Sequence, residues 1–158
     1  MIITLRRTQM TVVETQFIQH PENIPLRYSI SDAPIEYQHR QYSMPCHSGL
    51  RFYSQRYIAP QQWLHLSIPL HDSHFEIDAQ VCWCEPIKNA AGHIKNYSIG
   101  VSFTNHNTAF SARMAEQVCH IEAYRKIVKK QEGRELSSDQ AASEWIAKHA
   151  DQFPPMLN

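Results

Sequence analysis

The fold is decided by residues 64–103, which read LHLSIPLHDSHFEIDAQVCWCEPIKNAAGHIKNYSIGVSF. Apolar and polar residues alternate in three runs of this stretch, a spacing that predicts β-strands with one buried face. The apolar positions are Leu64, Leu66, Ile68 and Leu70, then Phe75, Ile77, Ala79, Val81 and Trp83, and finally Tyr97, Ile99, Val101 and Phe103. Residues 71–73 and 89–92 are rich in turn formers and separate the three runs.

Three further strands are expected upstream, over residues 24–30, 35–42 and 50–53. No helical pattern lies between any of these six strands, an arrangement typical of an antiparallel barrel or sandwich. The sequence therefore predicts a mainly β fold, with a six-stranded antiparallel β-barrel over residues 15–107 and an N-terminal segment over residues 1–14.

After residue 107 the apolar spacing becomes helical. Phe110, Met114, Val118, Ile121 and Val128 are expected to form the buried face of a helix. Asn107 is its expected N-cap, and Gly133 is expected just past its end. The stripe is long for covering one small barrel, so its far end is expected to pack on a second helix or on a second subunit.

A second helix is expected to begin at Ser137, because Ser137-Ser138-Asp139-Gln140 matches a capping box. Its apolar stripe is Ala141, Ala142, Trp145, Ile146 and His149. Residues 108–158 thus read as a two-helix extension of the barrel.

The 158 residues carry 15 basic and 15 acidic side chains and a net charge of zero. This balance argues against a protein that holds DNA or another polyanion by bulk electrostatics. The apolar runs are too short to cross a bilayer and no secretory pattern follows Met1, so a cytoplasmic protein is expected. The four cysteines lack the spacing of a disulfide framework, so free thiols are expected.

Several histidines and cysteines have the residue types of metal or catalytic sites, but their spacing favours neither. His71-x-x-His74 lacks a second pair of ligands, and Cys82-x-Cys84 is too short for the common zinc knuckle. Adjacent residues of an extended segment point apart, so His47 is a poor base for Cys46. Four glycines leave no room for a phosphate-binding loop. We therefore expect no enzyme, no cofactor and no metal site.

Four basic residues, Arg125, Lys126, Lys129 and Lys130, gather near the end of the first helix. A contact with an anionic partner is one interpretation. A solvated helix end whose cations complement the helix dipole is the other, and we favour it.

The order of motifs resembles that of the PilZ domain, a small bacterial β-barrel best known as a receptor for the second messenger cyclic di-GMP. The resemblance covers about residues 15–130. It is carried by Phe17-Ile18-Gln19-His20-Pro21, Gly49-Leu50-Arg51-Phe52, Ala79-Gln80-Val81-Cys82-Trp83 and Ile99-Gly100-Val101-Ser102-Phe103. It implies a non-enzymatic module of bacterial second-messenger signalling.

PilZ domains that bind the dinucleotide use Arg-x-x-x-Arg before the first barrel strand and Asp/Asn-x-Ser-x-x-Gly on the barrel. Here Thr15 and Gln19 stand at the arginine positions, Met44 and Cys46 replace the Asp/Asn and the serine, and only Gly49 matches. The ligand site that the resemblance implies comprises Gly49, Gln19, His20, Arg40 and Arg51.

Three functional hypotheses follow. The prediction is an adaptor that contacts a protein of motility, pilus or surface regulation, with Arg27, Arg51 and Tyr53 as contact residues. The alternative is a divergent cyclic di-GMP receptor that recruits arginines from Arg6, Arg7, Arg40 and Arg51. The third is an enzyme or metal protein built on the histidines and cysteines.

Overall fold

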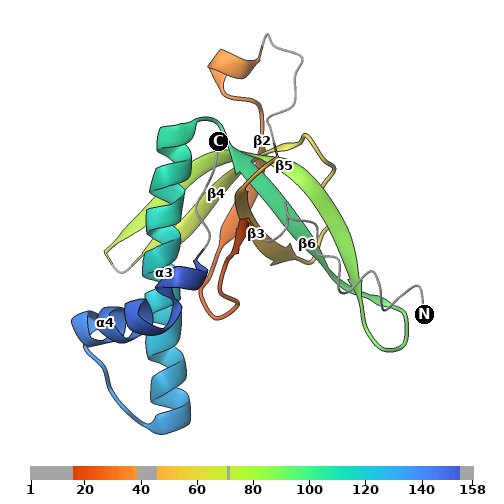
Figure 1. Ribbon diagram of the computed structural model, residues 1–158. Helices are drawn as coiled ribbons and strands as arrows, with labels where there is room; N and C mark the ends of the chain where they lie inside the picture. The colour runs from red at the N-terminus through yellow and green to blue at the C-terminus, as the bar shows by residue number, and fades with distance from the viewer. Residues whose placement is uncertain (1–15, 39–45, 71, 154–158) are drawn as a thin grey trace.

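The computed structural model describes residues 16–38, 46–70 and 72–153, and a six-stranded sheet dominates it (Figure 1). The strands are β1 (Phe17–Gln19), β2 (Arg27–Ser31), β3 (Gly49–Ser54), β4 (Trp63–Leu70), β5 (Ser73–Lys88) and β6 (Ile94–Phe103). Alternation in the sequence predicted β2 to β6, whereas β1 is too short to show a period.

The sheet is mixed and open, so the prediction of a closed antiparallel barrel is wrong. Its strand order is β1-β3-β6-β5-β4-β2. β1 runs parallel to β3, and the other four pairs are antiparallel. β1 and β2 are the edges, and within the described part of the chain no backbone ladder joins them. An alternating pattern identifies strands and their buried faces but not the partner of each edge.

The sheet nevertheless curls until side chains of β2 and β3 meet. The Tyr28 hydroxyl lies 2.5 Å from Ser54 Oγ, and the rings of Tyr28 and Phe52 are 5.8 Å apart. Leu64, Leu66 and Ile99 are completely or almost completely buried in the core that this curvature encloses.

Residues 35–37 form a 3-10 turn, η1 (Ile35–Tyr37), rather than the start of the predicted strand 35–42. Tyr37 N–H donates to the Pro34 carbonyl at 2.8 Å, which closes the turn. Pro34 has no N–H to give to a sheet ladder, and its fixed φ suits a turn. Residues 39–42 of the predicted strand lie outside the described residues.

Cys46 and Cys82 form a disulfide, so the prediction of four free thiols is wrong for these two residues. Cys82 lies at a β-bulge, where the register with β6 shifts between Val81 and Trp83. The two Cα atoms are 5.8 Å apart, well inside the range that a bridge needs. Cys46 and Cys82 are 36 residues apart, so spacing in the sequence did not indicate the pair. Cys84 and Cys119 are free.

Two helices follow the sheet: α3 (His106–Glu132) and α4 (Ser138–His149), with the short turn η2 (Ala150–Gln152) after α4. α3 contacts β4, β5 and β6. Its C-terminal half extends past the sheet, and α4 crosses it there (Figure 1). Gly133 ends α3 in the left-handed conformation, and Ser137 and Gln140 form the capping box of α4, as predicted.

α3 packs on the sheet with a face of small residues, which differs from the predicted face. Its buried positions are Ala109, Ala112, Ala115, Glu116, Cys119, Ala123 and Val128. Of the predicted stripe, Val128 packs against Leu136 and Ala141, so this end of α3 is covered within the chain. Phe110, Met114 and Val118 are at least half exposed. The alanine face, and not the row of larger side chains, packs on the sheet because small side chains let a helix approach a sheet closely.

The two helices show no stretch that is both long and apolar enough to cross a bilayer, within the part of the chain that the structure describes.

Candidate functional site

The parallel pairing of β1 with β3 brings four of the predicted ligand residues to one edge of the sheet. Gln19 lies opposite Arg51 in the ladder, and Gly49 lies opposite Phe17. Gln19 Nε2 donates to the Arg51 carbonyl at 3.3 Å, and His20 N–H donates to the same carbonyl at 2.9 Å. The fifth residue, Arg40, lies outside the described residues, as do Arg6, Arg7, Thr15 and Met44.

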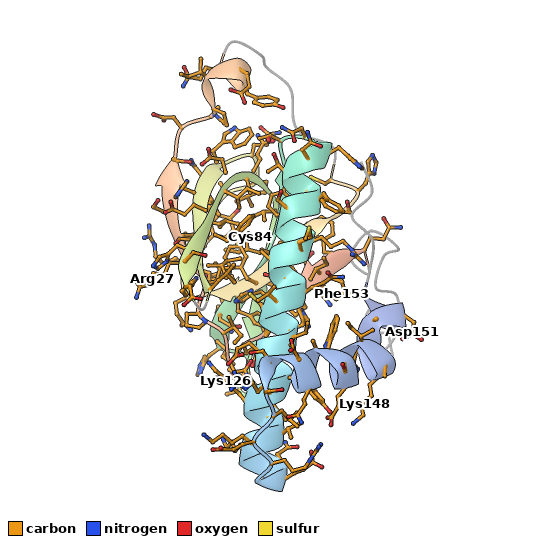
Figure 2. The ribbon with its side chains drawn as sticks, turned by 90° about the vertical axis from the view of Figure 1, so that its left-hand side faces the viewer. Arg27, Cys84, Lys126, Lys148, Asp151 and Phe153 are labelled. Atoms are coloured by element: carbon orange, nitrogen blue, oxygen red, sulfur yellow. A yellow bond between two sulfur atoms is a disulfide. The ribbon has the colours of Figure 1, made fainter. Side chains whose placement is uncertain are left out.

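A cleft of about 910 Å³ opens beside this edge. Its walls are β1 with the turn that follows it, the C-terminal half of α3, and α4. Aromatic rings line part of the cleft, and two of them, Trp145 and Phe153, stack edge to face with centroids 5.5 Å apart. Phe153 and Lys126 belong to different parts of the wall, at the end of η2 and on α3 (Figure 2).

The charge in the cleft is predominantly positive. Arg51, Lys126 and Lys130 line it, and the one carboxylate among the described lining residues is Glu22. Arg51 Nε is buried and lacks a hydrogen-bond partner among the described residues. A guanidinium N–H without an acceptor favours an anionic ligand. The cleft is therefore suited to a small anion that also carries an apolar or aromatic group.

A cluster of ionisable side chains lies between β1 and α3, next to the cleft. His20 Nδ1 is 2.6 Å from Glu116 Oε1, and His20 Nε2 is 2.8 Å from the Ile24 carbonyl oxygen. His120 Nε2 lies 2.8 Å from the Gln19 carbonyl oxygen. His20, Glu116 and Cys119 are 5%, 0% and 1% exposed. The buried pair of His20 and Glu116 therefore fastens the edge strand to the helix, whereas the side chain of His120 is 26% exposed and lines the cleft.

Burial and the charge of Glu116 together shift the pKa values of this cluster. Burial opposes a charged His20, but the hydrogen bond and charge of Glu116 outweigh it, so the pKa of His20 is raised. Burial lowers the pKa of His120 despite the same carboxylate. Burial, with Glu116, raises the pKa of Cys119 to about 12, so the free thiol stays protonated.

Of the three predicted protein-contact residues, Arg51 is the one that lines the cleft. Arg27 is exposed on the edge strand β2 (Figure 2), and Tyr53 is exposed near the end of β3. Neither is among the described residues that line the cleft, whereas Arg51 is. An exposed strand residue of this kind gives no sign of a binding surface by itself.

The disulfide removes two of the cysteines considered above as metal ligands or nucleophiles. Neither Cys46 nor Cys82 offers a thiolate while the bond is intact. His74 is exposed on β5, and its predicted companion His71 lies outside the described residues.

Three large apolar residues project from α3 into solvent. Phe110, Met114 and Val118 are 57%, 52% and 50% exposed, and their spacing of four residues places them in one row along the helix. We name Phe110, Met114 and Val118 the apolar row. A contiguous exposed row of this kind is typical of a protein–protein contact.

Two features of this region were not predicted from the sequence. The basic end of α3 was predicted, but not that Lys126 and Lys130 line the same cleft as Arg51. The pairing of His20 with Glu116, which are 96 residues apart, was not predicted either. The one available signal for the pair was a glutamate within the alanine face of α3. No family model, curated protein or solved structure matches this chain.

Proposed function

We propose that this chain is a non-enzymatic regulatory module of the PilZ type in bacterial cyclic di-GMP signalling, and that it acts by binding another protein. The observation that carries the proposal is the apolar row on α3, whose three side chains are each at least half exposed. Burying the exposed half of such a side chain against a partner contributes roughly 1 kcal/mol for each one. The partner is a component of motility, pilus or surface regulation.

The state of the nucleotide motif favours protein contact over nucleotide binding. Gln19, at the position of the second motif arginine, gives its amide to the carbonyls of Arg51 and His20. A neutral amide cannot replace the bidentate grip of a guanidinium on phosphate or guanine. Each lost charge-assisted bond costs about 1.5–3 kcal/mol, so two losses weaken binding by at least about a hundredfold.

The experiment is crosslinking in living cells with the wild-type chain, Met114→Glu and Ser143→Glu. Ser143 is exposed on α4, outside the apolar row, so it controls for the added charge. We expect Met114→Glu to reduce capture of the partner at least about tenfold and Ser143→Glu to leave it unchanged. Equal capture by all three chains would refute the proposal. Sedimentation of the purified protein shows whether the partner is a second copy.

A divergent receptor is the second candidate, favoured by the three cations Arg51, Lys126 and Lys130 that line one cleft. Calorimetry with cyclic di-GMP separates the two candidates. The adaptor proposal predicts no binding at micromolar concentrations. The receptor alternative predicts micromolar binding that Arg51→Ala abolishes and Arg27→Ala, outside the cleft, preserves.

A further inference from the structure

We propose a structural zinc site formed by His20, Glu116 and Cys119, at the junction of β1 and α3. The three side chains offer one imidazole nitrogen, one carboxylate oxygen and one sulfur, and these atoms all lie within 4.8 Å of one another. A mixed set of sulfur, nitrogen and oxygen donors suits Zn²⁺, whereas Ca²⁺ and Mg²⁺ take oxygen donors.

The backbone presents the three donors to one point. Glu116 and Cys119 are three residues apart on α3, so they share a face of the helix. His20 follows β1, which the ladder with β3 holds against that face. Zinc bonds of about 2.0–2.3 Å place tetrahedral ligands about 3.5 Å apart. Small side-chain rotations, which lengthen the 2.6 Å contact between His20 and Glu116, reach that geometry.

Two details point to a ligand beyond the coincidence of residue types. Glu116 is fully buried, and its Oε2 makes no hydrogen bond with the described residues, since His120 Nε2 lies 3.9 Å away in a long ion-pair contact. A buried carboxylate oxygen is costly to leave without a hydrogen bond. His20 Nε2 lies 2.8 Å from the Ile24 carbonyl. A metal-bound histidine typically donates its second N–H to a carbonyl in this way, which leaves Nδ1 free to ligate.

The charges balance when zinc binds. The Cys119 thiol and one His20 nitrogen release their protons to solvent, and Glu116 ligates as a carboxylate. One Zn²⁺ with one thiolate, one carboxylate and a neutral imidazole is uncharged in total, as a site with almost no solvent exposure requires. The second oxygen of Glu116 takes the fourth position, so protein atoms fill the coordination shell. A site closed in this way fits a structural role rather than a catalytic one.

The test measures metal on the untagged full-length chain. Inductively coupled plasma mass spectrometry is expected to find one zinc ion per chain in the wild type and in Cys84→Ser, which removes the other free cysteine. His20→Gln and Cys119→Ala are expected to lose it, with affinity at least about a hundredfold weaker. Zinc retained by both variants, or absent from the folded wild type after incubation with Zn²⁺, would overturn the site.

A second readout covers the case in which the ligand variants fail to fold. Chelator-stripped wild-type protein is titrated with Co²⁺, which takes the same ligands as zinc. Coordination by Cys119 predicts a thiolate-to-cobalt charge-transfer band that Cys84→Ser retains. A wild type that stays folded and binds no Co²⁺, or a band that depends on Cys84, would show that His20 and Glu116 form an ordinary buried ion pair.

Discussion

At two positions of the sheet a glycine is needed because there is no room for a Cβ atom, and not because of the backbone conformation. A Cβ on Gly49 would overlap the carbonyl oxygen of Val101, and a Cβ on Gly100 would overlap the indole of Trp83. Neither has a positive φ, unlike Gly92 and Gly133. Gly49 is the one residue that matches the second PilZ motif, and the close packing of β3 on β6 by itself accounts for a glycine there.

We expect Gly49→Ala to lower the free energy of unfolding by roughly 1–3 kcal/mol, because the new methyl group meets backbone that cannot rotate away. Urea denaturation measures the change. Gly92→Asn is the control, since Gly92 has open space around it and asparagine tolerates the left-handed conformation. If Gly49→Ala unfolded at the same urea concentration as the wild type, there would be room for a methyl group between Gly49 and the Val101 carbonyl.

His65 on β4 predicts a modest dependence of stability on pH. Its Nδ1 lies 3.0 Å from Asp78 Oδ1 and its Nε2 lies 3.5 Å from Glu76 Oε1. The hydrogen bond to Asp78, opposed by slight burial and helped by Glu76, raises the pKa of His65 above 6.5. The stabilisation is therefore complete below pH 6.5 and is lost as the pH rises through the folded-state pKa.

Because the three side chains are well exposed, we expect this loss to be only a few tenths of a kcal/mol. Urea denaturation at pH 5.5 and pH 8.5 measures it, with His65→Gln and Asp78→Asn as variants. Each variant should reduce the difference between the two pH values. Wild-type stability that rises over this range relative to His65→Gln would contradict the assigned ion pairs.

At the scale of the elements, the start of α3 is set by Asn105 rather than by the predicted Asn107. Asn105 Oδ1 accepts the Thr108 N–H at 2.8 Å, whereas Asn107 already lies inside the helix. We expect Asn105→Ala to lower the free energy of unfolding by about 1 kcal/mol. Asn107→Ala should leave it within about 0.5 kcal/mol. Equal effects of the two substitutions in thermal or urea unfolding would place the cap elsewhere.

The elements that the sequence predicted are those whose own residues carry a period or a cap. Apolar residues alternate along β4 and along parts of β5 and β6, and Gly133 and Ser137 bound the helices by local chemistry. The bulge at Cys82 in β5 did not show in that alternation. Features that depend on partners distant in the sequence could not be predicted from it. The parallel β1–β3 ladder, the open edge at β2 and the choice of the alanine face on α3 are decided by which surfaces meet.

The candidate site likewise contains residues that the sequence could indicate and residues that it could not. Gln19, Gly49 and Arg51 were found because a resemblance placed them, and the ladder brings them together. Glu116 and Cys119 were not predicted to join His20, because helical spacing shows which residues share a face but not what that face covers.

At the scale of the whole molecule, the edge strand β1 and the turn after it are held by hydrogen bonds to α3, which lies about 100 residues away in the sequence. His20 pairs with Glu116, His120 lies within hydrogen-bond distance of the Gln19 carbonyl, and Asn23 Nδ2 donates to the Ala123 carbonyl at 3.3 Å. β1 has only three residues, so its ladder alone is short. The cleft therefore depends on α3 and β1 being fixed together.

The disulfide between Cys46 and Cys82 is a covalent tie of another kind, because it closes a loop that contains β3 and β4. The bond spans 36 residues of sequence, and closing a loop of that length raises the free energy of the unfolded chain by on the order of 4 kcal/mol.

We expect reduction of this disulfide to lower the urea midpoint accordingly while the near-UV spectrum of the native protein stays the same. Cys46→Ser should match the reduced wild type and lose all response to reductant, whereas Cys84→Ser should respond as the wild type does. A wild-type midpoint indifferent to reductant would mean that the bridge does not form, since a loop-closing bond must act on the unfolded state even where it leaves native packing unchanged.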